Sequence, residues 1–474
     1  MGFRRRLLCA FGLIGLLAGV GTAARAASGG VHWGSAIEVP GTAILNPGGS
    51  AAVSSISCPS TGNCAAGGFY RDGSGFDHAL VVGEKSGVWR HASEVPGMTA
   101  LNLGRDAQVR SVSCARTGDC AAGGFYRDGS GQDQAFVVES GAWGSAIEVP
   151  GIAALNLGGS AGTNAISCAR TGNCAAGGFY MDGSFHWQAF VVSEKSGVWR
   201  NARAVPGLAS LNLGGQAFVF AISCASAGNC AAGGYYRDGS VHDQAFVVSE
   251  TKGVWRKAIE VPGTAALNLG GAARVTSVSC TSTGNCAAGG YYHDGSGHSQ
   301  TFVVSEKSGV WRKAIKVPGT AALNVGGFAD VNSISCASTG NCAAGGQYSD
   351  GSLHYQAFVV SETKGVWRKA IEVPGTAALN VGGFAGVNSI SCASTGNCVA
   401  GGSYSDSSAH SQAFVVSEKS GVWRKESELR GTAGMNAGGQ AAVTSISCGS
   451  TGSCAAGGYY TDGSSNTQPF VTSP

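Results

Sequence analysis

The chain has 474 residues, of which only 12% are charged, and its formal net charge is +3. So weak a charge excludes partners that are selected by a strong long-range field, and it lacks the basic surface typical of nucleic-acid binders. We therefore expect no nucleic-acid partner.

The N-terminus has the pattern of a secretory signal peptide, predicted over residues 1–27. Arg4, Arg5 and Arg6 precede the apolar run 7–20, and Ala24-Arg25-Ala26 offers a small-residue cleavage site. The run is shorter than the roughly 20 residues that a membrane helix needs, and no later segment approaches that length, so we expect no membrane span. Removal of this segment takes four of the 31 basic residues and leaves 27 against 28 acidic ones. The mature chain is therefore nearly neutral.

A repeat of about 56 residues fills residues 28–474, which we predict to be one domain. Tryptophan is its clearest marker, with a step of 56 residues everywhere except 54 between the second and third copies. The eight positions are Trp33, Trp89, Trp143, Trp199, Trp255, Trp311, Trp367 and Trp423. A period of this size indicates a propeller, a solenoid or an array of small domains.

Each repeat contains four strand segments and no convincing helix, as the unit around Cys280 shows. The segments 273–280, 286–293, 300–306 and 310–317 are separated by short polar turns. Asp294-Gly295, between the second and third segments, predicts a type I′ hairpin, because both central residues of that turn need positive φ. A longer link, 318–327, leads to the next repeat. This connectivity is that of a propeller blade, whose outer strand must reach the inner strand of the next blade.

The two ends of the chain supply complementary parts of one blade. The repeat region opens with a lone fourth segment, 31–39, and stops after a third segment, 468–472. We therefore predict an all-β, eight-bladed propeller of four-stranded antiparallel blades, closed by pairing of the N-terminal strand with the C-terminal blade. The alternative is an array of independent small β domains.

Sixteen of the 17 cysteines form eight Cys-x5-Cys pairs, and the other, Cys9, belongs to the signal segment. An even number of regularly spaced cysteines behind a secretory signal predicts disulfides. Metal binding is disfavoured, because no histidine lies near any pair to complete a ligand set. The pairs are Cys58/Cys64, Cys114/Cys120, Cys168/Cys174, Cys224/Cys230, Cys280/Cys286, Cys336/Cys342, Cys392/Cys398 and Cys448/Cys454.

The residues that follow Asp-Gly-Ser vary most between repeats, and the connectivity places these turns on one face together with the long links. Five repeats have a histidine at one equivalent position, and an aromatic residue follows it in two of them. We predict that this face binds a polar ligand such as a glycan or peptide. The predicted residues are His186, Trp187, His242, His298, His354, Tyr355 and His410. The alternative is structural, with the histidines donating hydrogen bonds to turn carbonyls.

Catalytic and metal sites find no support in the residue spacing. Three pairs of aspartates, Asp72/Asp77, Asp128/Asp133 and Asp238/Asp243, would suit calcium, but the other five repeats lack the second aspartate. The main departures from the repeat are the shortened turn 139–143, Phe218 with Phe220, and Leu429-Arg430, and none supplies a nucleophile, a base and an oxyanion donor. We expect no catalytic residue, no metal and no cofactor.

Two motifs resemble known repeats. Gly289 to Ser296, followed by Gln300 to Val304 and Gly309-Val310-Trp311, resembles bacterial extracellular repeats with a His-Ala-Phe signature, which appears here as His78-Ala79-Leu80 and Gln134-Ala135-Phe136. Ser-Cys-x5-Cys-Ala is similar to the cysteine-paired repeats of secreted actinobacterial-type propellers. The resemblance implies a secreted β-propeller but no particular activity.

Together these observations favour a secreted, monomeric, non-catalytic scaffold that binds a glycan, a peptide or a surface protein. The alternative is a propeller enzyme. Sialidase-like propellers have Ser-x-Asp-x-Gly turns and an arginine cluster, which do not stand out here. Quinoprotein dehydrogenases have a longer Gly-x-x-x-Trp motif than Gly309-Val310-Trp311 and an adjacent cysteine pair that is absent.

Overall fold

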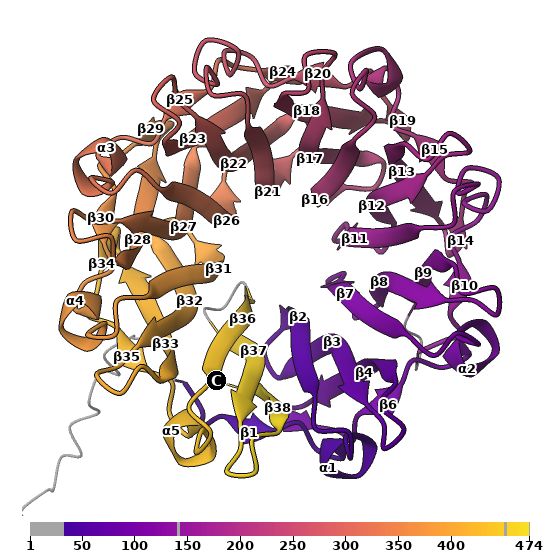
Figure 1. Ribbon diagram of the computed structural model, residues 1–474, viewed down its shortest axis with the longest axis horizontal. Coiled ribbons are helices and arrows are strands. Elements are labelled where there is room, and N and C mark those ends of the chain that lie inside the picture. Colours follow the sequence, from indigo (N-terminus) through magenta and orange to yellow (C-terminus); the bar gives the residue numbers. More distant parts are fainter. Residues whose placement is uncertain (1–32, 140–142, 450–452, 474) are drawn as a thin grey trace, which may run out of the picture. The chain divides into compact units, whose positions relative to one another are not determined.

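The computed structural model describes residues 33–139, 143–449 and 453–473. In this part of the chain, eight antiparallel sheets stand as blades around a central axis (Figure 1), which confirms the predicted eight-bladed propeller. We number the blades 1 to 8 in the order of their inner strands. The predicted signal peptide, residues 1–27, lies outside the described residues, and the domain limits 28–474 stay a prediction.

Every blade has an inner, a second and a third strand, which pair in that order. The inner strands are β2 (Ala51–Ser60), β7 (Ala107–Cys114), β11 (Ala161–Cys168), β16 (Ala217–Ser226), β21 (Ala273–Ser282), β26 (Ala329–Ser338), β31 (Ala385–Ser394) and β36 (Ala441–Cys448). The second strands are β3 (Asn63–Arg71), β8 (Cys120–Arg127), β12 (Cys174–Met181), β17 (Asn229–Arg237), β22 (Asn285–His293), β27 (Asn341–Ser349), β32 (Asn397–Ser405) and β37 (Cys454–Thr461). The third strands are β4 (Asp77–Lys85), β9 (Asp133–Glu139), β13 (Trp187–Lys195), β18 (Asp243–Thr251), β23 (Ser299–Lys307), β28 (Tyr355–Thr363), β33 (Ser411–Lys419) and β38 (Thr467–Val471).

The outer strand, predicted as one segment, is split in six of the blades. Its first part carries the tryptophan: β5 (Val88–Trp89), β14 (Val198–Trp199), β19 (Val254–Trp255), β24 (Val310–Trp311), β29 (Val366–Trp367) and β34 (Val422–Trp423). Its second part is β6 (Ser93–Glu94), β15 (Arg203–Ala204), β20 (Ile259–Glu260), β25 (Ile315–Lys316), β30 (Ile371–Glu372) and β35 (Ser427–Glu428). In the other two blades the outer strand within the described residues is β10 (Ile147–Glu148) or β1 (Ile37–Glu38). The outer strand is interrupted because a residue between its two parts donates a hydrogen bond to the preceding blade. Ala258 N–H, for example, donates to the Pro206 carbonyl at 2.7 Å.

The ring closes as predicted. Strand β1 pairs antiparallel with β38, with Ile37 opposite Val471 and Glu38 opposite Phe470. The hydrogen bond between outer strands of neighbouring blades, described above for Ala258 and Pro206, is repeated at this junction. Here Ala36 N–H donates to the Arg430 carbonyl at 2.7 Å. Blade 8 is therefore built from both ends of the chain.

The links between blades contain single helical turns that the sequence analysis did not predict. They are α1 (Thr42–Leu45), α2 (Met98–Leu101), α3 (Thr320–Leu323), α4 (Thr376–Leu379), α5 (Thr432–Met435) and a 3₁₀ turn, Leu208–Ser210. No helix among the described residues is long and apolar enough to cross a membrane.

The predicted type I′ geometry of the Asp-Gly turns is wrong. In blade 1 neither Asp72 nor Gly73 has positive φ, and the left-handed residue is instead Gly75, with φ of 85°. The Asp72 carboxylate accepts hydrogen bonds from the N–H groups of Ser74 and Phe76 at 2.8 and 3.0 Å, which holds a wider loop. Because the second position needs no positive φ, the Asp406-Ser407 pair of blade 7 fits equally well.

Small residues and serines hold neighbouring blades together. A β-carbon at Gly233 would lie 2.5 Å from Cγ1 of Val275 in the next blade, so only glycine permits this approach. The last serine of each Ser-Ile-Ser-Cys motif accepts a hydrogen bond from the cysteine N–H of the next blade, as Ser335 does from Cys392 at 3.0 Å.

The eight predicted disulfides are all formed, one at the loop between the first two strands of each blade. They are Cys58–Cys64, Cys114–Cys120, Cys168–Cys174, Cys224–Cys230, Cys280–Cys286, Cys336–Cys342, Cys392–Cys398 and Cys448–Cys454. The partners lie directly opposite each other in the strand register, as Cys230 lies opposite Cys224 and Cys398 opposite Cys392. Each bridge therefore ties the inner strand to the second strand of its own blade.

Candidate functional site

The links and the Asp-Gly-Ser turns lie on one face, as predicted, and we call it the link face. Isolated parallel bridges join the start of a third strand to the end of the following link, as between Asp243 and Ala272. The disulfide loops lie with the turns that follow the third strands, since Gly253 N–H donates to the Gly228 carbonyl at 2.8 Å. We call that opposite side the disulfide face.

The predicted disulfide cysteines are structural groups and not part of an accessible site. The second cysteine of every pair is buried, and Cys230 and Cys398, for example, are only 5% and 3% exposed. Both pack among the apolar side chains between neighbouring blades. The Cys-x5-Cys spacing predicts the bond but not this burial, which arises because the second strand lies inside the blade.

The five predicted histidines are exposed, and each lies at its own blade interface. Their backbone N–H groups donate to the turn aspartates, as His242 does to Asp238 at 3.0 Å. Their rings pack over left-handed glycines of the next link, so that a β-carbon at Gly271 would lie 2.6 Å from Cδ2 of His242. The equivalent pairs are His186 with Gly215, His298 with Gly327, His354 with Gly383 and His410 with Gly439. The histidines thus have a packing role, whereas the expected bonds from their rings to turn carbonyls do not occur among the described contacts.

The residue before the histidine adopts a strained conformation in several blades. Phe185, Val241 and Leu353 have φ of 61°, 66° and 63°, and their exposures are 73%, 68% and 71%. Left-handed φ is unusual for any side chain and is an outlier for a β-branched one. Blades 1, 2 and 5 have glycine here, so the fold does not demand these side chains. Such strain is concentrated at functional sites.

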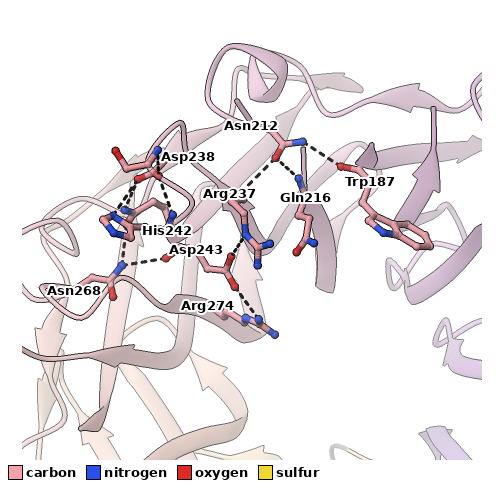
Figure 2. Close-up of polar contacts among 11 residues, drawn as sticks. Trp187, Asn212, Gln216, Arg237, Asp238, His242, Asp243, Asn268 and Arg274 are labelled. Atoms are coloured by element: carbon pink, nitrogen blue, oxygen red, sulfur yellow. Dashed lines mark hydrogen bonds and ion pairs between the residues drawn. The ribbon is translucent and has the colours of Figure 1, made fainter. Parts of the chain in front are cut away.

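The glutamine that follows belongs to a structural chain of hydrogen bonds. Gln188 donates to Asp182 at 2.9 Å and accepts from Asn212 at 3.0 Å. Asn212 Nδ2 also donates to the Trp187 carbonyl at 3.1 Å, while its Oδ1 accepts from Gln216 N–H at 2.8 Å (Figure 2). These amide groups are satisfied within the protein and are not free for a ligand.

Trp187 belongs to an aromatic cluster that spans blades 3 and 4. Its ring centroid lies 5.3 Å from that of Phe179 and 5.5 Å from that of Phe218. Phe218 and Phe220 stack against Tyr235 at 5.5 and 5.6 Å. The cluster is only partly buried, apart from Tyr235. It gives the link face one broad aromatic surface.

Tyr355 has a smaller version of the same arrangement in blade 6. Its ring lies 5.4 Å from Phe328 and 5.8 Å from Phe384, both of which belong to links. The two predicted aromatic residues are therefore each joined by aromatic residues from neighbouring links or inner strands.

A charged chain extends the Trp187 cluster into blade 5. Asp243 accepts hydrogen bonds from Arg237 at 2.9 Å and from Arg274 at 2.8 Å, and Figure 2 shows it between the two arginines. The Arg274 guanidinium lies 4.2 Å from the centroid of the Tyr235 ring. Burial raises the pKa of Tyr235 and of Tyr291, so both hydroxyls keep their protons. We call Trp187, Phe218, Tyr235, Asp243 and Arg274, with the side chains that touch them, the inner patch.

The aspartate pairs that would suit calcium are used otherwise. Asp77, Asp133 and Asp243 each bind the arginine that ends the second strand, at 2.7 to 2.9 Å. Their partners Asp72, Asp128 and Asp238 accept backbone N–H groups within the turn. Among the described residues no group of three or more metal-ligating side chains is found.

Asp330, on inner strand β26, is a further polar group that sequence reasoning missed. Burial raises the pKa of its carboxyl to about 6, and its Oδ1 has no hydrogen-bond partner within the described residues. The second residue of each inner strand varies inside an otherwise regular motif. This variation is a sequence signal that could have located Asp330 and part of the inner patch. The varying residues are Ala52, Gln108, Gly162, Phe218, Arg274, Asp330, Gly386 and Ala442.

Comparisons with known proteins add structural similarities. No family model matches the chain, and no curated protein does. The β-propeller domain of the Trilobed protease from Pyrococcus furiosus superposes with a TM-score of 0.44 and 8% identity, over 80% of this chain and 98% of that one. A PL25 ulvan lyase superposes with a TM-score of 0.40 and 10% identity, over 85% of this chain and 95% of that one. Hadza microbial sialidase Hz136 superposes with a TM-score of 0.38 and 10% identity, over 71% of this chain and 68% of that one. Similarity at this level carries no information about activity.

Proposed function

We propose that the protein is a secreted, non-catalytic scaffold whose link face binds a glycan or a peptide. The observation that carries the proposal is the inner patch. Residues that break the repeat, dispersed through the sequence from Trp187 to Arg274, come together as one partly exposed surface of aromatic rings and paired charges. Aromatic faces and fixed hydrogen-bonding groups are what a polar, ring-containing ligand needs.

The surroundings of the inner patch support the same role. Phe185 and Val241 lie in the turns next to Trp187 and Asp243 and are held exposed with left-handed φ. In this proposal the predicted histidines His186 and His242, which follow Phe185 and Val241 in the sequence, complete the rim of the surface. In this proposal His298, His354, Tyr355 and His410 extend the binding face around the ring.

The charges of the inner patch favour binding over catalysis. Arg237 and Arg274 share the carboxylate of Asp243 and are not free to bind a substrate carboxylate together. No nucleophile with an adjacent base lies among the described residues of the patch. A propeller enzyme, such as a sialidase-like hydrolase, is therefore the second candidate.

The disulfide in every blade supports export, because such bonds persist in oxidising compartments.

A binding screen with matched variants tests the proposal. The double variant Trp187→Asp/Phe218→Ala uses residues that other blades have at these positions, namely Asp243 and Ala442, so the fold should survive. On a glycan and peptide array we expect the wild type to bind and the double variant to lose at least tenfold in affinity. Ser411→Asp, at the position equivalent to Trp187 in blade 7, is the control and should bind normally.

Two outcomes would contradict the proposal. Equal binding by the double variant would exclude the inner patch as the site. Turnover of a glycoside by the wild type, in a parallel panel of glycosidase substrates, would favour the enzyme alternative.

The histidines are tested separately by the triple exchange of His186, His242 and His354 for alanine.

A further inference from the structure

A cavity lies on the disulfide face, between blades 1 and 2. Its volume is about 740 Å³, against about 260 Å³ for the corresponding cavity between blades 6 and 7. It lies in the size range of small-molecule sites, roughly 300–1,000 Å³. The side chains that matter for its chemistry are Lys85, Arg90, Arg116 and Trp143. We call it the blade 1–2 pocket.

The pocket exists because this interface lacks a contact that other interfaces have. Between blades 3 and 4, Trp255 Nε1 donates to Ser193 Oγ at 2.9 Å, and Ser193 Oγ donates to Glu250 at 2.7 Å. The residue equivalent to Ser193 in blade 1 is Gly83, which has no hydroxyl. Trp143, the counterpart of Trp255, is only partly buried, whereas Trp255 is 6% exposed.

The length of the chain also differs here. Two residues fewer separate Trp89 from Trp143 than separate the other neighbouring tryptophans. The shorter repeat and the missing serine hydroxyl are consistent with the wider space at this interface than between blades 6 and 7.

The pocket is lined by cations without acidic partners. Lys85, Arg90 and Arg116 are exposed, and none of them forms an ion pair within the described residues. Apart from Glu84, no acidic residue is found among the described residues that line the pocket. An excess of unpaired positive charge in a concave site favours an anionic ligand.

Glu84, which belongs to the same strand as Lys85, does not neutralise these cations. Its Oε1 accepts a hydrogen bond from Ser473 Oγ of blade 8, so the buried carboxylate faces the interface between blades 8 and 1. Side chains alternate along the strand, and Val81, Gly83 and Lys85 therefore face blade 2.

We propose that the blade 1–2 pocket binds an acidic sugar. The anionic group contacts Lys85, Arg90 and Arg116, and the apolar side of the ring packs against Trp143. A carboxylate and a phosphate meet the same cations, so the shared chemistry is a pyranose ring with one anionic substituent. This site is separate from the inner patch and lies on the opposite face.

The test uses titration calorimetry with four probes: glucuronate, glucose 6-phosphate, glucose and inorganic phosphate. We expect wild-type protein to bind at least one of the two acidic sugars, and to bind glucose and inorganic phosphate at least tenfold more weakly. The better of the two acidic sugars identifies the preferred anion. No binding of either acidic sugar, or equal binding of inorganic phosphate, would overturn the proposal.

Gly83→Phe is the blocking variant. A β-carbon at Gly83 meets nothing within 4 Å, so a larger side chain can enter the pocket without displacing the fold. We expect this variant to melt like the wild type and to lose acidic-sugar binding at least tenfold. Unchanged binding by the folded variant would place the ligand elsewhere and contradict the proposal.

Charge removal gives an independent result. Arg90→Ala/Arg116→Ala should weaken acidic-sugar binding at least tenfold, whereas Arg312→Ala, at the position of Arg90 in blade 5, should not. Equal weakening by Arg312→Ala would indicate a general charge effect and reject the site. The inner-patch variant Trp187→Asp/Phe218→Ala should bind the acidic sugar normally, so that failure of one proposal is distinguishable from failure of the other.

Discussion

Single side chains in the turns of the link face carry strain that the fold does not require. Val241 has φ of 66° and is 68% exposed, while Gly75, Gly131 and Gly297 occupy the same position in other blades. An L-residue in this conformation costs roughly 1–2 kcal/mol. The same stretch supplies the side chains that we propose contact the ligand.

Val241→Gly should therefore stabilise the protein and weaken ligand binding. We expect the free energy of unfolding to rise by about 0.5–1 kcal/mol, because relief of strain exceeds the entropy that glycine adds to the unfolded chain. Chemical denaturation measures the change. Gly297→Val is the reverse control, and it should destabilise by a similar amount. A lower stability of Val241→Gly would show that the side chain is held by favourable contacts.

Asp330 gives a pH-dependent prediction. Burial raises the pKa of its carboxyl to about 6, so the folded state binds this proton more tightly than the unfolded state does. Its stabilising contribution is present below the ordinary pKa near 4 and is lost as the pH rises through 6. Asp330→Asn should therefore be more stable than the wild type by about 1–2 kcal/mol at pH 8 and nearly equal at pH 4.

Asp294 provides the control with the opposite sign. Burial acts to raise the pKa of this carboxyl, but hydrogen bonds from the Ser296 and His298 N–H groups and from Gln300 outweigh it, and the net shift is downward. Asp294→Asn should lose stability at pH 8 relative to the wild type. Thermal melts at pH 4 and pH 8 compare the two variants. The same pH response in both would refute the assignment.

The inner strands of neighbouring blades are joined by a ladder of serine hydroxyls. The first serine of Ser-Ile-Ser-Cys accepts from the backbone of the next blade, as Ser333 does from Ile390 N–H at 3.1 Å. Six interfaces have this bond, and the two without it have Ala165 or Ala221 in place of the serine. The motif therefore serves blade packing as well as strand formation.

A reciprocal pair of substitutions tests this ladder. Ser333→Ala should lower the free energy of unfolding by about 1 kcal/mol, because it leaves the Ile390 N–H without its acceptor. Ala221→Ser should add the missing bond to Val278 N–H and raise stability slightly. Ser352→Ala, in an exposed turn, is the control. If all three variants denature at the same midpoint, the ladder contributes nothing.

The architecture was predictable from the sequence, while the composition of the candidate site was only partly so. Trp, Cys and the long link recur with a fixed period, so the strand order and the ring closure could be predicted by counting the strand segments of the repeats. The turn geometry could not be predicted in this way, because Asp72 stabilises its loop through its own carboxylate. The inner patch needed the structure, since Trp187, Phe218 and Arg274 belong to three different repeats and meet only when blades pack.

Closure of the ring depends on a short pairing between β1 and β38. Val39 is fully buried and Ala36 is 6% exposed, so this segment also fills the core of the junction. A chain that begins at Pro40 should leave the edge of β38 unpaired, and unpaired edges promote self-association. We expect a lower melting temperature and larger particles in size-exclusion chromatography with light scattering than for a chain that begins at Gly29. A truncated protein that stays monomeric with an unchanged melt would contradict this role.

The joint between β1 and β38 also sets an order of events during biosynthesis. Strand β1 is made long before its partner β38, so blade 8 cannot form until β38 has been synthesised. Until then β1 has no partner strand and the ring is open.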